Sequence, residues 1–121
     1  MEYCNNFEYD LKLGQIKEKE LGLIFNEKTI EVKTDLQAAE TGSVFVEYES
    51  RGKPSGIAKS KADYYCFVIG HGSFILIETD KLKKKCRNFI NTNLDRKGGD
   101  NNTSKGILLP VLQLVLTIDC S

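Results

Sequence analysis

Two apolar segments joined by a short turn constrain the fold of this 121-residue chain more than any other feature. Residues 64–69 and 73–78 are largely apolar, and they flank Gly70-His71-Gly72, which has the composition of a turn. Apolar runs of this length are typical of strands in the middle of a sheet, where both faces are covered. We therefore predict two adjacent buried central strands, with His71, the only histidine, in a surface turn between them.

Two segments of helical character would cover such a sheet. Apolar residues from Leu13 to Phe25 recur at helical spacing, which predicts a first helix. A basic segment that begins at Thr79 or Asp80 and runs to about Leu94 predicts a second helix.

The rest of the chain predicts strands and loops. Residues 95–106 are polar and rich in Gly, Asn and Asp, which predicts a flexible loop. The apolar segment Ile107–Ile118 predicts one strand or two, with Pro110 at an edge or a bend. The order of helix, hairpin, two strands, helix and terminal strand predicts an α/β fold with a mixed central β-sheet flanked by helices. The length fits one domain, so we expect residues 1–121 to form a single unit.

The hairpin in this order comes from two segments of alternating polarity. Residues 28–35 place Glu31 and Lys33 on one face, and residues 43–49 alternate in the same way. If the two segments pair across their short connection, Glu31 lies opposite Glu47. Because like charges that face each other destabilise a strand pair, this hairpin needs compensation, which a divalent cation would provide.

Carboxylates in this arrangement have the chemistry of a magnesium site. Mg²⁺ prefers carboxylate oxygens and water, and it often binds the phosphate of a substrate as well. Acids of the hairpin and of the first helix would hold a metal that activates water and neutralises a phosphodiester. Lys33, on the same strand face as Glu31, would orient the attacking water or stabilise the charge that develops on the phosphate.

Three acidic motifs follow one another along the chain: Gly14-Gln15-Ile16-Lys17-Glu18, Ile30-Glu31-Val32-Lys33 and Val44-Phe45-Val46-Glu47-Tyr48-Glu49. In this order they resemble the PD-(D/E)xK nuclease superfamily, which includes type II restriction enzymes and Holliday junction resolvases. The resemblance covers about residues 13–70, and the stretch from Thr41 to Tyr64 is also similar to small phage-borne nucleases of that superfamily. It implies a restriction-endonuclease-like fold and a Mg²⁺-dependent or Mn²⁺-dependent endonuclease that hydrolyses DNA.

The resemblance also assigns roles by position. Glu18 corresponds to the helix acid, with Glu20 as the neighbouring alternative. Glu31 and Glu47 correspond to the two strand acids. The resemblance therefore implies that Glu18, Glu31 and Glu47 bind the metal and that Lys33 assists the attacking water.

The sequence departs from the superfamily at its lysine. Glu49 stands where the superfamily has lysine, which leaves Lys33 as the lysine on the matching face. A second assignment takes Glu31-Val32-Lys33 as the ExK motif itself, although no acidic strand precedes it. Because of Glu49, a non-catalytic nucleic-acid-binding module with a degenerate site is the alternative to a nuclease. A small interaction protein that binds through its acidic hairpin is the third reading.

The charge distribution favours a nucleic-acid partner. Residues 1–60 hold eight bases and eleven acids, a net of −3, whereas residues 61–121 hold nine bases and six acids, a net of +3. Arg51, Lys53 and Ser55 would contact backbone phosphates, and the basic helix would add sequence-independent attraction. We expect DNA as the partner, and a homodimer would supply the two sites that duplex cutting or junction resolution needs.

Composition indicates a cytoplasmic protein. No apolar run approaches the roughly 20 residues that a membrane-spanning helix requires, and the first six residues lack the features of a targeting signal. The four cysteines form no CxxC motif and only one histidine is present, which argues against a zinc site. We expect Cys4, Cys66, Cys86 and Cys120 to be reduced thiols.

Overall fold

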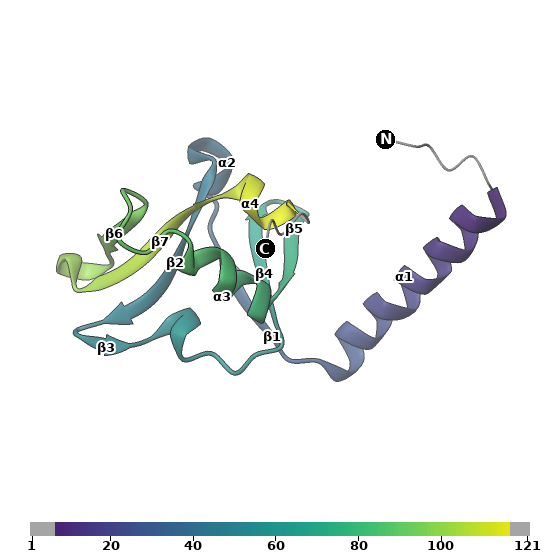
Figure 1. Cartoon of the computed structure of the whole chain (residues 1–121). Coiled ribbons are helices and arrows are strands. Elements are labelled where there is room, and N and C mark those ends of the chain that lie inside the picture. Colours follow the sequence, from purple (N-terminus) through teal and green to yellow (C-terminus); the bar gives the residue numbers. More distant parts are fainter. Residues whose placement is uncertain (1–6, 117–121) are drawn as a thin grey trace.

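The computed structural model describes the backbone of residues 7–116 and the side chains of residues 15, 17–99 and 101–116. The strands in this range are β1 (Ile30–Thr34), β2 (Ser43–Ser50), β3 (Lys53–Pro54), β4 (Tyr64–Gly70), β5 (Ser73–Glu78), β6 (Asp95–Gly98) and β7 (Ser104–Pro110). They form two separate sheets (Figure 1). Sheet A has the strand order β1-β4-β5, and sheet B has the order β3-β2-β7-β6.

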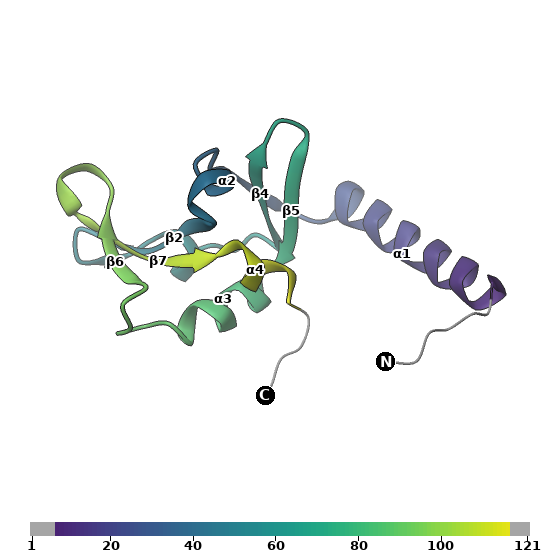
Figure 2. The same cartoon turned by 90° about the horizontal axis from the view of Figure 1, so that it is seen from above.

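Helices and short turns connect the strands. They are α1 (Phe7–Glu27), α2 (Ala38–Thr41), the 3₁₀ turn η1 (Gly56–Ala58), α3 (Thr79–Arg87), the 3₁₀ turn η2 (Asp100–Asn102) and α4 (Val111–Val115). Figures 1 and 2 both show α1 extending away from the two sheets, with only its C-terminal end near sheet A. In contrast, α3 contributes the buried side chains of Leu82 and Cys86 to the core.

Sheet A has one buried face and one open face. β1 runs parallel to β4, and β4 runs antiparallel to β5. Tyr65 and Phe67 are buried on the inner face, whereas Val32 and Phe74 are more than half exposed on the outer face. The two predicted strands are therefore confirmed, but only β4 is central, and β5 is an edge strand. His71 is exposed in the turn between them, as predicted.

Sheet B is antiparallel and supplies the other half of the core. β7 lies between β2 and β6, and it pairs with β2 along its whole length. Val44, Ile107 and Leu109 are completely buried on its inner face. They belong to one hydrophobic cluster with Phe67 of sheet A and Leu82 of α3. The core therefore lies between the two sheets and α3.

The predicted hairpin of two acidic strands does not form. β1 pairs with β4, so Glu31 lies opposite Tyr65. β2 pairs with β3 and β7, so Glu47 lies opposite Gly106. The repulsion expected between Glu31 and Glu47 across a strand pair is therefore absent. Alternation identifies a segment as a strand with two different faces, but it does not identify the neighbouring strand.

Further predictions are corrected. The mixed α/β class is confirmed, but two sheets replace the expected single central sheet. The basic helix ends at Arg87 instead of Leu94, and the turns that follow it include Asn91 in the left-handed region. Residues 95–106 hold β6 and the start of β7 instead of a flexible loop. The segment predicted as one strand or two is a strand only as far as Pro110, and Val111–Val115 form α4 instead. Pro110 lies at the bend between β7 and α4, as predicted.

Phe45 lies against two glycines of neighbouring strands. A Cβ atom at Gly106 would lie 2.6 Å from Cζ of Phe45 and 2.7 Å from the carbonyl oxygen of Val46. A Cβ atom at Gly98 would lie 2.8 Å from the same Cζ atom. The ring thus occupies the space that side chains on β6 and β7 would fill, and sheet B requires glycine at these positions.

We expect Gly106→Ala to lower the free energy of unfolding by about 1–3 kcal/mol, the usual cost of overpacking a core. Gly22→Ala is the control, because a Cβ atom there meets nothing within 4 Å. In a helix this change should be neutral or stabilising by up to about 1 kcal/mol. Urea unfolding followed by circular dichroism measures both variants. Equal stability of the two variants would contradict the tight packing of Phe45.

Candidate functional site

A cavity of about 160 Å³ lies between β1 and β4 of sheet A, β2 of sheet B, and η1. We call it the Lys33–Glu47 cavity. Its polar side chains include Lys33 and Glu47, and its apolar wall includes Ile57 and Phe67. A basic residue, itself exposed, and an acidic residue therefore line one cavity from two different sheets.

Strand register explains why Lys33 faces this cavity. Lys33 lies opposite Phe67 in the parallel pair of β1 and β4, so both side chains project from the inner face of sheet A. Glu31, two residues earlier, projects from the same face and lies opposite Tyr65. The strand thus places Glu31 and Lys33 together, as the sequence predicts.

Glu31 also influences a second residue of the cavity wall. Burial raises the pKa of the Tyr65 hydroxyl, a hydrogen bond with Ser60 lowers it, and the charge of Glu31 raises it. Tyr65 is 2% exposed and lines the Lys33–Glu47 cavity. Glu31 itself is not among the residues that line the cavity. Tyr65 is a site residue that sequence reasoning missed, because only the register with Glu31 reveals it.

The loop after β3 holds Glu47 in place. The Ser55 hydroxyl donates a hydrogen bond of 3.0 Å to Oε2 of Glu47. The Ser55 backbone N–H donates another, of 3.0 Å, to the carbonyl oxygen of Tyr48. Gly56 has a φ of +52°, and a Cβ atom there would overlap the carbonyl oxygen of Glu47. Ser55, predicted to contact phosphate, thus has a partner inside the protein and orients the Glu47 carboxylate.

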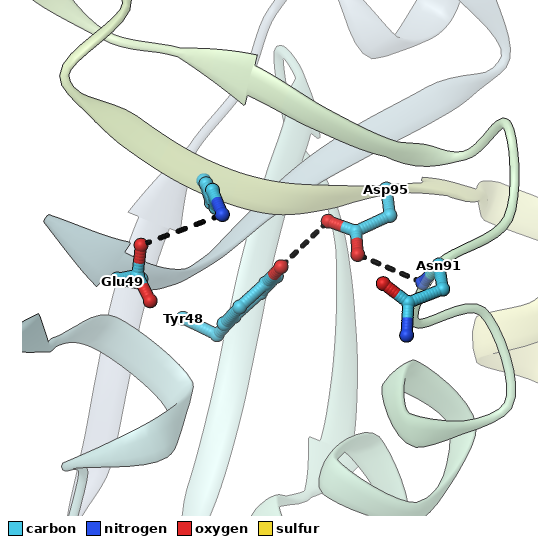
Figure 3. Close-up of polar contacts among 5 residues, drawn as sticks. Tyr48, Glu49, Asn91 and Asp95 are labelled. Carbon is cyan, nitrogen blue, oxygen red and sulfur yellow. Dashed lines mark hydrogen bonds and ion pairs between the residues drawn. The ribbon is translucent and has the colours of Figure 1, made fainter. Parts of the chain in front are cut away.

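Glu49 faces a different partner. The strand register shifts between Glu47 and Glu49, which indicates a bulge in β2. Beyond the bulge, Glu49 forms an ion pair of 3.8 Å with Nζ of Lys105 on β7 (Figure 3). Glu49 is therefore engaged with sheet B and is not among the residues that line the Lys33–Glu47 cavity.

Tyr48, at the bulge, is fixed by a polar network. Its hydroxyl donates a 2.7 Å hydrogen bond to Oδ1 of Asp95, and Oδ2 of Asp95 accepts one of 2.9 Å from the backbone N–H of Asn91 (Figure 3). Burial and the bond to Asp95 raise the pKa of Tyr48 to about 12. The network ties β2 to β6 and holds the Tyr48 ring in one position.

The predicted phosphate-binding residues Arg51 and Lys53 lie at the tip of the β2–β3 hairpin. Both are exposed. Arg51 and Gly52 have φ angles of +53° and +78°, so they form the turn of this hairpin. Neither base lines the Lys33–Glu47 cavity, but both belong to the hairpin that immediately precedes Ser55.

The helix acids are not brought to the cavity. Glu18 is exposed on α1, which extends away from the sheets (Figures 1 and 2). Glu20 pairs with Lys17 at 3.2 Å and lines another cavity, beside Tyr64 and Lys85. The expected convergence of Glu18 with Glu31 and Glu47 is thus not seen, because helical periodicity defines the apolar side of a helix but not the surface it packs against.

The donor set near the cavity limits how a metal would bind. Among the described side chains, no three His, Cys, Asp or Glu residues gather in a group that could hold a metal ion. Mg²⁺ in enzymes is often held by only one or two carboxylates, with water and substrate phosphate as the other ligands. Glu47 and Glu31 have the oxygen chemistry for that mode of binding.

Comparisons with models of protein families, with curated proteins and with solved structures find no match to this chain. None of the helices within residues 7–116 is long and apolar enough to cross a membrane. Cys66 and Cys86 are free thiols, whereas Cys4 and Cys120 lie outside the described residues.

Asp63 fastens the two parallel strands where they begin. Its Oδ2 accepts hydrogen bonds of 3.0 Å from the backbone N–H of Thr29 and of 3.1 Å from the Thr29 hydroxyl. Its own backbone N–H donates to Thr29 in return. Thr29 precedes β1 and Asp63 precedes β4, so this contact helps to set the register that places Lys33.

We expect Asp63→Asn to lower the free energy of unfolding at neutral pH. We also expect the variant to lose less stability than wild type when the pH is lowered. Hydrogen bonds from Thr29 hold the pKa of the Asp63 carboxyl below its usual value. Such a group stabilises the fold above its usual pKa, and this contribution is lost as the pH falls through the lowered pKa of the folded state. Urea unfolding at about pH 7 and about pH 2 measures how much the free energy of unfolding falls with acid. This fall should be smaller for the variant than for wild type. Glu27→Gln, at the exposed end of α1, is the control, and equal differences in all three proteins would refute the expectation.

Proposed function

We propose that this chain is a metal-dependent endonuclease that hydrolyses phosphodiester bonds of DNA. The observation that carries this proposal is the convergence of Lys33 and Glu47 in one cavity, with Glu31 beside Lys33 on the same strand face. Phosphodiester hydrolysis needs a carboxylate that can bind a cation and a positive charge near the reacting phosphate. Glu47 and Lys33 supply these two groups.

The residues would divide the work as follows. Glu47 and Glu31 would bind Mg²⁺ or Mn²⁺, which when bound neutralises the phosphate and lowers the pKa of water. The Lys33 ammonium would orient the attacking water or stabilise charge on the phosphate. Ser55 would keep the Glu47 carboxylate in the orientation that the metal requires, because its hydroxyl already bonds one carboxylate oxygen.

We assign the chain to the PD-(D/E)xK type as part of this proposal, with a restriction-endonuclease-like fold. Two observations support Lys33 as the lysine of the site. Glu49, at the usual lysine position, is paired with Lys105. Glu31 and Lys33 share a strand face, and Lys33 lines the same cavity as Glu47. Glu47 would therefore be the acid that the second assignment, Glu31-Val32-Lys33, lacks in the preceding sequence.

DNA would reach this site along basic surface. Arg51 and Lys53 are exposed on the hairpin that leads to Ser55, and they would contact phosphates next to the cavity. Glu18 has no place in this version of the site. A cytoplasmic location goes with the proposal, because free thiols such as Cys86 persist in a reducing compartment.

Metal-dependent cutting is the test. We expect the protein to cut plasmid or branched DNA in Mg²⁺ or Mn²⁺ but not in EDTA, and we expect Glu47→Gln to reduce the rate by about 100-fold or more. Glu49→Gln is the matched control, since it removes one carboxylate from the same strand outside the cavity and should retain activity. Circular dichroism verifies that both variants fold. Unchanged cutting by Glu47→Gln would overturn the assignment of this site.

The alternative is a nucleic-acid-binding module without catalysis. The position of Glu18 on α1, away from the other two acids, and the identity of Glu49 both favour it. Salt-dependent DNA binding without cutting in any metal would establish this reading. The third reading, an interaction protein with an acidic hairpin, loses its basis because Glu31 and Glu47 lie in different sheets.

We expect a homodimer, which would provide two cutting sites. Exposed apolar side chains are available to form it, namely Leu23 and Phe25 on α1 and Val32 and Phe74 on the outer face of sheet A. Sedimentation equilibrium over a range of concentrations should show dimers, and Phe74→Lys should shift the population towards monomer. A monomer at every concentration would contradict this expectation.

A further inference from the structure

A second cavity lies on the other side of η1. It has a volume of about 290 Å³ and lies between η1, α3 and the end of β2, and we call it the α3 cavity. Ile57 of η1 lines both this cavity and the Lys33–Glu47 cavity. Glu47 and Tyr48 are consecutive residues of β2, and each lines one of the two cavities. A ligand in the α3 cavity would therefore be a neighbour of one in the candidate active site.

The walls of the α3 cavity combine an apolar interior with positive charge. Ile57, Cys86 and Ile90 provide the apolar part. Burial raises the pKa of the Cys86 thiol to about 12, so this side chain stays neutral. Lys83 and Arg87 are four residues apart on α3, which places both on the same side of the helix.

The two cations of the α3 cavity are available to an anion. Among the described residues, neither Lys83 nor Arg87 forms an ion pair with an acid. Lys83 makes only a long contact of 3.4 Å to the carbonyl oxygen of Ser60. Lysine and arginine that lack acidic partners beside a cavity are suited to bind phosphate.

An aromatic ring completes the cavity. Tyr48 lines it, and the hydrogen bond from the Tyr48 hydroxyl to Asp95 fixes the ring in advance of binding (Figure 3). A fixed aromatic side chain provides a stacking surface for any base, because every base has a π face. The cavity thus offers a stacking surface and an apolar interior, which suit a base, and two cations, which suit a phosphate.

We propose that the α3 cavity binds an unpaired nucleotide of the DNA substrate, with the base stacked on Tyr48 and the phosphate held by Lys83 and Arg87. This proposal rests on nucleic acid being the partner, as stated above. In a duplex the bases are stacked and paired, and moving one into a cavity costs free energy. Single-stranded or branched DNA, which has unpaired nucleotides already, would therefore be the preferred substrate.

Binding in EDTA tests this proposal without requiring any cutting. Fluorescence anisotropy would compare a labelled single-stranded oligonucleotide with a blunt duplex of the same sequence at one salt concentration. We expect wild type to bind the single strand about tenfold more tightly, as one stacked base would provide. Lys83→Gln with Arg87→Gln should abolish this preference. The control, Lys81→Gln with Lys84→Gln, removes two positive charges from the same helix outside this cavity. It should weaken the binding of both DNAs equally and keep the preference for the single strand.

A third variant distinguishes the contribution of the cavity from that of its positive charges. Ala58 is exposed and lines the α3 cavity, so Ala58→Phe should fill it without disturbing the core. We expect Ala58→Phe to lose the single-strand preference while retaining duplex binding. A wild type without the preference, or an Ala58→Phe variant that keeps it, would overturn the proposal. If wild type shows the preference but never cuts DNA, the nucleotide site stands and the nuclease assignment fails.

Discussion

Parallel pairing of β1 with β4 is the constraint on which the candidate site depends. Parallel strands cannot be joined by a tight turn, so the chain between them must cross over the sheet. Here the crossover comprises residues 35–63 and includes β2, β3 and η1. It carries Glu47 to the inner face of sheet A, where Lys33 lies. The contact of Asp63 with Thr29 holds the two strands together at the ends from which they begin.

Local patterns in the sequence predict where most strands lie but not how they pair. Alternation and apolar runs predict β1, β2, β4 and β5 close to their observed bounds. The partner of β2 is β7, more than 50 residues away in the chain, and no local pattern encodes such a contact. β6 is a clearer case, because residues 95–98 contain no apolar side chain. They form a strand because their backbone pairs with β7 and because Asp95 accepts a hydrogen bond from Tyr48.

Part of the candidate site could be predicted from the sequence, but the arrangement that brings its residues together differs from the predicted one. The sequence predicts Glu31, Lys33 and Glu47 as neighbours on one hairpin, whereas the structure brings Lys33 and Glu47 together across a cavity between two sheets. The position of Glu18 relative to the cavity could not be predicted from sequence patterns, because the packing of a helix depends on the surface that it meets. The bond from Ser55 to Glu47 depends on the folded loop, although the Ser-Gly pair within a turn-rich segment marks that loop as shaped.

The position of β7 in the sheet has a consequence for biosynthesis. β7 comes from residues 104–110, yet it is the central strand to which both β2 and β6 pair. Until residues 104–110 have been translated, the only strand available to pair with β2 is the two-residue β3, although the core residues of β4 and α3 are already present. The long edge of β2 therefore keeps unpaired backbone N–H and C=O groups until β7 emerges from the exit tunnel, which makes this protein a candidate client for chaperones that bind extended segments.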